Sequence, residues 1–306
     1  MPTQSVRAPS RFSGSPNLPG DKSISHRALI FGALATGRTE VIEPLESGDV
    51  HSTARCLEAL GVKLARRGRA IVVEGVGYDG LRTPAGILDC GNSGTTIRLL
   101  MGVLSGSHPP GGLTAQLTGD ASLVKRPMKR VAEPLRLMGA KIQLTGDDLA
   151  PVSVEGSRLH GIDYELKVAS AQIKTAILLA GLAADGATTI TGEIQSRDHT
   201  ERMLRYFGVN VDAGPEFVRL QGRQPLNGTT VRVPGDPSTA AFWMGGACLV
   251  PGGDVQLENI CLNPTRIGFV RVLERMGARI ELERTDEQPE PVGRIHVRSG
   301  SLRGIT

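Results

Sequence analysis

The chain has 306 residues, a formal net charge of +4 and a hydrophobic content of 40%. This length allows about two domains with a core each, and the ordinary apolar content excludes a disordered protein. No apolar run reaches the roughly 18–20 residues of a membrane-spanning helix, the N-terminus lacks the apolar segment of a secretory signal, and 3% aromatic residues argue against a stacking surface for single-stranded nucleic acid. We therefore expect a cytoplasmic protein that binds small anions, with no membrane and no nucleic-acid partner.

The cysteines and histidines do not form a metal-binding or disulfide pattern. No CxxC spacing occurs among the cysteines, and no HExxH pair occurs among the six histidines. A chain of this size does not need disulfides for its stability. We expect no metal site, and we expect four buried or incidental thiols in a reducing compartment: Cys56, Cys90, Cys248 and Cys261.

One sequence pattern recurs four times, in copies that begin near residues 18, 88, 166 and 231. Each copy has a short strand-like run, a Gly/Ser-rich turn, a first helix and a β-rich stretch, followed by a second helix and two short strands. The second helices end alike, in LEALGVKL, LRLMGAKI, LRYFGVNV and LERMGARI. A recurring supersecondary unit predicts a repeat architecture, here an α/β fold of βαβαββ units.

The two helices of this unit differ in polarity. The first helix is almost continuously apolar, which predicts burial on most sides, and Gly102, Gly181 and Gly245 would allow close approach to a neighbouring helix or sheet. The second helix has charges interleaved with apolar residues and is expected to lie outside. We predict a compact, pseudo-symmetric fold. An elongated solenoid is the alternative, although the unit is long for one.

The segment GDKSISHR, from Gly20 to Arg27, is the strongest local signal of a binding site. Ser23 is a candidate N-cap, so Lys22, the Ser23 hydroxyl and Arg27 would gather at the start of a helix. Exposed N–H groups, the helix dipole and two cations favour a phosphate or a carboxylate there. The alternative is an ordinary capped helix with solvated charges.

The segment GNSGTTIRLL, at residues 91–100, has the same design. Gly94 would let a ligand approach the backbone, and Arg98 lies one turn into the helix. Taken alone, this segment is better explained as a Gly-rich helix start.

Two further helix starts of this kind are SAQIK, at residues 170–174, and GDPST, at residues 235–239. If pseudo-symmetry directs several such N-termini at one space, their partial positive charges add and favour a polyanion.

A charge run lies in LTGDASLVKRPMKR, at residues 117–130. Its cations are Lys125, Arg126, Lys129 and Arg130. For most of these side chains we expect a solvated face at the start of an outer helix. At least one cation would lie on a loop beside a strand end and face a substrate.

The segment SRDHTERML, at residues 196–204, offers a further group of polar side chains: Ser196, Arg197, His199 and Glu201. A polar helix start with local ion pairs is the favoured interpretation of this group. Neither a Ser-His-Asp order nor a GxGxxG fingerprint occurs in the sequence, and no pair of carboxylates for acid–base work is evident.

Six motifs in this order, PGDKSISHR, GNSGTTIR, KRPMKRV, SAQIK, RDHTE and NPTR, closely resemble those of the 5-enolpyruvylshikimate-3-phosphate synthase family. The resemblance runs from about residue 12 to the end. It implies an inside-out α/β barrel of βαβαββ units, six in two domains of three, of which four are present here. Residues 21–232 would then form a complete three-unit domain, and residues 1–20 and 233–306 part of a second.

The resemblance also implies a reaction. Enzymes of this family join shikimate 3-phosphate to phosphoenolpyruvate: the 5-hydroxyl adds to the enol carbon, and phosphate leaves the tetrahedral intermediate. Both substrates are anionic, no metal or organic cofactor is required, and we expect a monomer.

Individual residues match positions with known roles in the family. Lys22 matches a lysine that touches both substrates and assists proton transfer. The positions that match shikimate 3-phosphate ligands are Lys22, Ser23, Arg27, Ser170, Ala171, Gln172 and Ser196. The positions that match the phosphoenolpyruvate pocket are Lys22, Gly94, Arg126 and Gln172.

The chain departs from the family pattern in one respect. It has no counterpart of the segments that carry an aspartate base, a KESDR-type glutamate and arginine, a His-Arg pair and a final lysine. Such acid–base groups contribute about 10²–10⁴-fold to rate, so we expect the chain alone to release no phosphate. A non-catalytic anion-binding module or incomplete fold is therefore an alternative. A UDP-N-acetylglucosamine enolpyruvyl transferase is a lesser one, which GDKSISHR and SAQIK disfavour.

Overall fold

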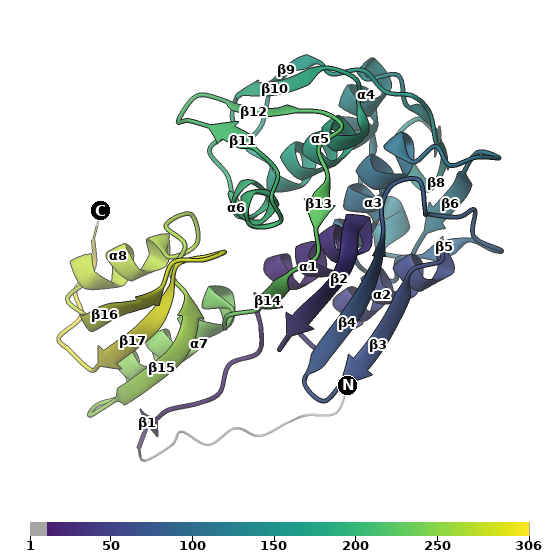
Figure 1. The fold of residues 1–306 in the computed structure, drawn as a ribbon. Helices are drawn as coiled ribbons and strands as arrows, with labels where there is room; N and C mark the ends of the chain where they lie inside the picture. The colour runs from purple at the N-terminus through teal and green to yellow at the C-terminus, as the bar shows by residue number, and fades with distance from the viewer. Residues whose placement is uncertain (1–10, 306) are drawn as a thin grey trace. The chain divides into compact units, whose positions relative to one another are not determined.

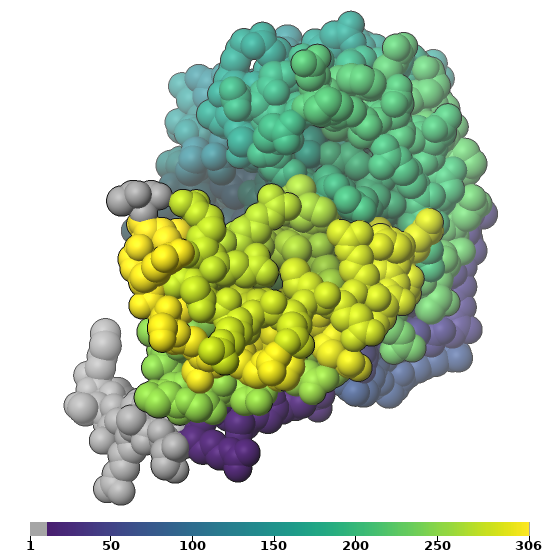
Figure 2. Space-filling model, turned by 90° about the vertical axis from the view of Figure 1, so that its left-hand side faces the viewer, coloured from purple at the N-terminus to yellow at the C-terminus, as the bar shows by residue number. Residues whose placement is uncertain are grey.

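The computed structural model describes residues 11–305, which fall into two compact units (Figure 1 and Figure 2). The large unit is Lys22–Val233. The small unit combines Pro234–Thr306 with the N-terminal segment that ends at Asp21. Residues 1–10, which we assigned to the second domain from the sequence, lie outside the described residues.

The large unit alternates helices with short runs of strands. Its α-helices are α1 (Lys22–Leu34), α2 (Gly48–Ala59), α3 (Gly94–Gly106), α4 (Lys129–Leu137), α5 (Ala171–Ala183) and α6 (His199–Tyr206). Its strands are β2 (Ala35–Ile42), β3 (Lys63–Arg67), β4 (Ala70–Val76), β5 (Leu88–Asp89), β6 (Thr114–Thr118), β7 (Lys141–Thr145), β8 (Leu149–Glu155), β9 (Asp163–Leu166), β10 (Ala187–Gly192), β11 (Val211–Ala213), β12 (Val218–Gln221), β13 (Leu226–Asn227) and β14 (Thr230–Arg232).

The sheets of the large unit share one strand order. A central strand, which is β2, β6 or β10, has a parallel neighbour on one side and an antiparallel neighbour on the other. Strand β2 has β13 and β14 as parallel neighbours and β4 as its antiparallel neighbour. For β6 the parallel neighbour is β5 and the antiparallel neighbour is β8, and for β10 they are β9 and β12. An edge strand, β3, β7 or β11, then pairs with the antiparallel neighbour. The large unit therefore repeats one mixed-sheet topology.

The apolar helices α1, α3 and α5 lie in the interior of the large unit, and the sheets lie around them (Figure 1). Almost every residue of these helices is buried, as the continuous apolar pattern predicted. α3 packs against α5 at Gly102, where an added Cβ would lie 2.4 Å from the carbonyl oxygen of Ala176. Helix α5 packs against its own sheet at Gly181, where an added Cβ would lie 2.8 Å from Thr188 Oγ1. The interior of the large unit is therefore a helix cluster, and the solenoid alternative is wrong for this unit.

The second helices lie at the surface and bury one face, as their interleaved charges predicted. In α4, the buried residues are Val131, Ala132, Pro134 and Leu135, and the charged residues point outward. The inner helices α1, α3 and α5 have polar residues at their N-terminal ends and are mostly apolar elsewhere.

The small unit has the same strand order in its sheet, β1-β15-β17-β16. Its elements are β1 (Ser13–Gly14), α7 (Pro237–Leu249), β15 (Asp254–Cys261), α8 (Gly268–Arg275), β16 (Arg279–Asp286) and β17 (Val292–Arg298). Met244, Leu257 and Ile295 belong to its buried core. One glycine expectation fails here, because an added Cβ at Gly245 of α7 would have no neighbour within 4 Å.

The thiols are buried, as predicted, and none of the cysteines in the described part of the chain forms a disulfide. Within residues 11–305, no helix has the length and apolar character that crossing a membrane requires.

Candidate functional site

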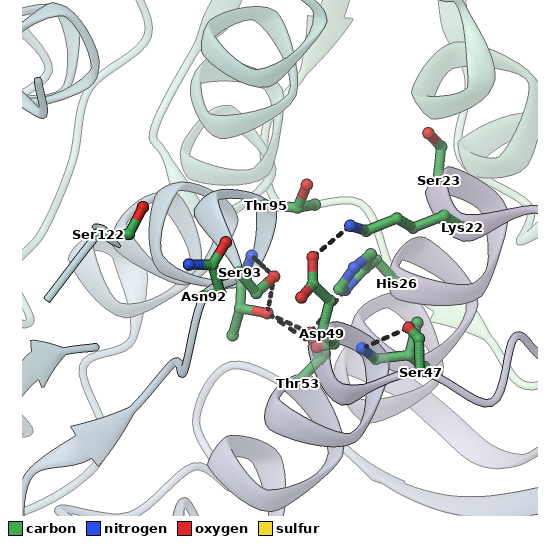
Figure 3. Close-up of polar contacts among 12 residues, drawn as sticks. Lys22, Ser23, His26, Ser47, Asp49, Thr53, Asn92, Ser93, Thr95 and Ser122 are labelled. Atoms are coloured by element: carbon green, nitrogen blue, oxygen red, sulfur yellow. Dashed lines mark hydrogen bonds and ion pairs between the residues drawn. The ribbon is translucent and has the colours of Figure 1, made fainter. Parts of the chain in front are cut away.

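Lys22 is the first residue of α1, and its ammonium group forms an ion pair with the carboxylate of Asp49 near the start of α2 (Figure 3). About half of the Lys22 side chain is exposed. Because α1 begins at Lys22, the prediction that Ser23 caps the helix is wrong, and Ser23 lies within the first turn. Both side chains are therefore at a helix N-terminus, where the dipole and the backbone N–H groups favour an anion.

Arg27 lies one turn further along α1 and is only 3% exposed. Its Nη1 donates to the carbonyl oxygen of Ser23 at 3.0 Å, so the predicted proximity to Ser23 is present. Its Nε donates to Thr200 Oγ1 and its Nη2 to Thr175 Oγ1, each at 2.8 Å. Arg27 thus joins α1 to both α5 and α6 within the large unit.

The start of α3 forms a second polar end of the helix cluster. Ser93 is the N-cap, and its hydroxyl accepts a hydrogen bond from the backbone N–H of Thr96 at 3.1 Å. An added Cβ at Gly94 would lie 2.9 Å from Arg98 Nη1 and 3.3 Å from Arg126 Nη1. The two guanidinium groups therefore lie close to the backbone of Gly94.

Arg98 connects the start of α3 to the start of α5. Its Nη1 donates to Gln172 Oε1 at 2.8 Å, and Gln172 Nε2 donates to Thr95 Oγ1 at 3.1 Å. Burial, followed by the positive charges of Arg130 and Arg126, lowers the pKa of Arg98 to about 10. A pKa lowered by neighbouring cations indicates excess positive charge, so an anion bound here would be stabilised.

The cations of the charge run at residues 125–130 lie in different surroundings. Arg126 Nη2 donates to Asn92 Oδ1 at 2.6 Å and to Ser122 Oγ at 3.3 Å, which holds its guanidinium beside the GNSG loop. Lys129 instead lies on α4 and approaches Glu133 at 3.9 Å on an exposed face.

The start of α5 is capped by Ser170, whose hydroxyl accepts from the backbone N–H of Ile173 at 3.4 Å, and Ala171 is its first residue. Ser196 lies on the loop that precedes α6 and donates to the carbonyl oxygen of Ile194 at 3.3 Å. The next residue, Arg197, donates from Nη1 to Ser23 Oγ at 3.3 Å. This contact brings the loop before α6 to the N-terminus of α1.

Lys174 and Glu201 form an ion pair inside the large unit, with 2.6 Å between Lys174 Nζ and Glu201 Oε1. The two side chains are 2% and 3% exposed. Lys174 also donates to the carbonyl oxygen of Ile194 at 3.3 Å. The expectation of local ion pairs in SRDHTERML is therefore wrong for Glu201, although Arg202 and Asp198 do form one at 2.8 Å.

Sequence reasoning did not single out Asp49, the ion-pair partner of Lys22. The available signal was weak: Asp49 follows Ser47, the N-cap of α2, and an acidic residue in a first turn is common in any helix. Its proximity to Lys22 depends on how α1 and α2 pack, which no local pattern specifies.

The NPTR motif lies in the small unit and forms a separate ionic cluster. Arg266 pairs with Asp21 at 2.5 Å and with Asp236 at 2.9 Å, and it also donates to Ser238 Oγ at 2.9 Å. The Arg266 side chain is 5% exposed. This motif therefore fastens the two sequence segments of the small unit to each other.

Comparison with known proteins gives one consistent result. Residues 6–303 match the family model described as EPSP synthase (3-phosphoshikimate 1-carboxyvinyltransferase). A protein of Prochlorococcus marinus (strain MIT 9303) named 3-phosphoshikimate 1-carboxyvinyltransferase is 49% identical over 98% of this chain and 69% of its own length. A protein of Bacillus licheniformis with the same name is 48% identical over 96% of this chain and 68% of its own length.

Solved structures agree with the sequence comparison. A structure of EPSP synthase from Acinetobacter baumannii has a TM-score of 0.88 and 46% identity, over 96% of this chain and 66% of that chain. This chain therefore spans about two thirds of the length of the relatives that it matches.

Proposed function

Because the chain belongs to the EPSP synthase (3-phosphoshikimate 1-carboxyvinyltransferase) family, a family of transferases in the shikimate pathway, we propose that its large unit binds shikimate 3-phosphate and phosphoenolpyruvate for enolpyruvyl transfer. In that reaction the 5-hydroxyl oxygen of shikimate 3-phosphate forms a bond to the enol carbon of phosphoenolpyruvate. Phosphate then leaves the tetrahedral intermediate, and the enolpyruvyl ether remains.

One observation carries this proposal: polar N-terminal ends of the helix cluster are linked to one another and surrounded by cations. Gln172 at the start of α5 is hydrogen-bonded to Arg98 and Thr95 of α3. Arg197, on the loop before α6, contacts Ser23 at the start of α1. Both substrates carry a phosphate and a carboxylate, and helix N-termini with adjacent guanidinium groups are suited to bind those groups.

Each side chain has a proposed role that fits its position. Lys22 contacts both substrates and assists proton transfer, since its side chain is about half exposed at the start of α1. Gly94 and Arg126 line the phosphoenolpyruvate pocket together with Lys22 and Gln172. The remaining shikimate 3-phosphate contacts would come from Ser23, Arg27, Ser170, Ala171, Gln172 and Ser196.

We also propose that the chain comprises four βαβαββ units, three of them in the large unit. The shared strand order of the sheets supports this division, because each sheet places its parallel neighbour, central strand and antiparallel neighbour alike. We propose that the chain is a monomer in solution.

Isothermal titration calorimetry of the purified chain tests the proposal. We expect shikimate 3-phosphate to release or absorb heat on binding and UDP-N-acetylglucosamine to give none. Heat from UDP-N-acetylglucosamine alone would instead assign the chain to the other enolpyruvyl transfer reaction, and heat from neither ligand would contradict binding by the large unit.

Replacing Lys22 with alanine is expected to weaken shikimate 3-phosphate binding by roughly 10- to 100-fold, because a hydrogen bond to a charged group contributes about 1.5–3 kcal/mol. The calorimetric Kd measures this change. Lys63, an exposed lysine on β3, provides the matched control, since Lys63→Ala removes the same charge from the large unit away from the site. Equal affinities of the two variants would remove Lys22 from the proposed site.

A further inference from the structure

We propose that Thr53 and Thr96 are positioning residues that hold the substrate-binding loop at residues 91–94 in register with α1. The inference rests on the proposed function, because it takes Lys22 and Gly94 as parts of one binding site. Both threonines are fully buried. They therefore cannot contact a substrate themselves, and any effect they have on binding must pass through other residues.

The two hydroxyls lie in the middle of a buried hydrogen-bond chain, here named the threonine relay, which consists of His26, Thr53, Thr96 and Ser93. His26 Nδ1 lies 2.7 Å from Thr53 Oγ1. Thr53 Oγ1 lies 2.6 Å from Thr96 Oγ1, which lies 2.7 Å from Ser93 Oγ. All four residues are 0% exposed. The relay thus runs from α1 through α2 to the N-cap of α3 (Figure 3).

The direction of each hydrogen bond follows from the donors available, because a hydroxyl has only one proton. Thr96 donates to Ser93 Oγ, which also accepts from the Thr96 backbone N–H. Thr96 Oγ1 therefore accepts from the Thr53 hydroxyl. The Thr53 oxygen then accepts from His26, so His26 carries a proton on Nδ1.

A second contact of Thr96 is weaker and does not change this direction. Its Oγ1 lies 3.4 Å from the carbonyl oxygen of Asp49, which is longer than an ordinary hydroxyl hydrogen bond. It does place the relay next to the backbone of the residue whose carboxylate pairs with Lys22. The relay therefore adjoins both the Lys22 ion pair and the GNSG loop.

The relay can control the loop because Ser93 Oγ has two functions. It is the end of the relay and also the N-cap acceptor of α3. A change at Thr53 that removes its hydroxyl takes away the donor to Thr96 and the acceptor of the His26 Nδ1–H, and a buried polar group that loses its partner is destabilised. The change at Thr96 would pass to Ser93 and so to the loop at residues 91–94, which carries Gly94 next to Arg98 and Arg126.

Three variants of the full chain test this inference. Thr53→Val removes the hydroxyl and keeps the shape, and Thr53→Ser restores a hydroxyl. Thr39→Val is the matched control, because Thr39 is also fully buried in the large unit and its Oγ1 has no hydrogen-bond partner among the described residues. We expect amide hydrogen exchange at residues 94–96 to become about tenfold faster in Thr53→Val and to stay unchanged in Thr39→Val, with Thr53→Ser close to the unsubstituted chain.

Two further readouts separate positioning from general stability. Long-range ¹H–¹⁵N spectra should show the Nδ1–H form of His26 in the unsubstituted chain and in Thr39→Val. The Kd for phosphoenolpyruvate should rise about tenfold in Thr53→Val and recover in Thr53→Ser. Unchanged exchange at residues 94–96 in Thr53→Val overturns the relay whether or not the chain binds ligands. If the unsubstituted chain binds neither substrate, the proposed function fails while the exchange result still decides the relay.

Discussion

Replacing Lys174 with methionine is expected to lower the free energy of unfolding by about 3–5 kcal/mol, because removing one partner of a buried ion pair leaves an uncompensated charge inside the protein. Glu201 is 3% exposed and is held by Lys174 Nζ at 2.6 Å. The second carboxylate oxygen, Oε2, has no hydrogen-bond partner within the described part of the chain. The side chain therefore has little else to compensate its charge. Urea denaturation followed by circular dichroism measures the loss.

Two controls separate burial from loss of charge alone. Lys141 and Glu155 form an ion pair on the surface of the same unit, with side chains 62% and 52% exposed. Lys141→Met should therefore lower the free energy of unfolding by less than about 1 kcal/mol. The double variant Lys174→Met with Glu201→Leu should recover most of the stability, because an apolar pair can replace a buried ion pair. A Lys174→Met effect no larger than that of Lys141→Met would contradict this account.

The Lys174–Glu201 pair also bears on the site. Lys174 lies on α5 two residues after Gln172, and its hydrogen bond to the carbonyl oxygen of Ile194 holds the loop that continues to Ser196. Loss of Lys174 should therefore loosen this loop in addition to lowering global stability.

Local sequence patterns predicted the features that depend on neighbouring residues. Ser93 and Ser170 were expected at helix starts, and each is an N-cap whose hydroxyl accepts from a backbone N–H three residues later. The two residues that form such a cap lie within one turn of the chain, so a local pattern is enough to predict it. The same reasoning failed for Ser23, because α1 begins at Lys22, directly after the chain passes from one unit to the other.

Contacts between distant segments could not be predicted in this way. The sequence placed Arg27 on the same helix face as Ser23, which is correct. It did not indicate that Thr175 and Thr200 would cover that face and take hydrogen bonds from the guanidinium. The pairing of Glu201 with Lys174 could not be predicted for the same reason, since a helical pattern defines a buried face and does not identify the neighbour that covers it.

The glycines of the first helices show this limit most directly. Gly102 and Gly245 each occupy the ninth position of a 13-residue apolar helix, and the sequence predicted the same close approach for both. An added Cβ at Gly102 would meet the backbone of Ala176, whereas at Gly245 it would meet nothing within 4 Å. Two helices with the same sequence pattern therefore pack differently at this glycine, and a single substitution at each glycine can distinguish the two environments.

Replacing Gly102 with alanine is expected to destabilise the chain by about 1–3 kcal/mol, whereas Gly245→Ala should stabilise it by up to about 1 kcal/mol, because alanine is the better helix former. The added methyl group at Gly102 would lie 2.4 Å from the Ala176 carbonyl oxygen and 2.9 Å from its Cα. A backbone cannot yield as a flexible side chain does, so α3 must move away from α5. Changes of opposite sign in the free energy of unfolding, measured by urea denaturation, would establish that the neighbouring atoms, and not helix propensity, decide the effect.

The displacement should also reach the binding site, because α3 and α5 are joined at their N-termini by the 2.8 Å hydrogen bond from Arg98 to Gln172. Separation of the helices at Gly102 would lengthen this bond and move Gln172, on α5, away from Gly94, on α3. We therefore expect Gly102→Ala to weaken phosphoenolpyruvate binding by about tenfold, equivalent to about 1.4 kcal/mol, under conditions in which the variant remains folded. Gly245→Ala should leave the Kd unchanged. A Gly102→Ala variant that loses stability and keeps full affinity would show that the site does not depend on the spacing of these two helices.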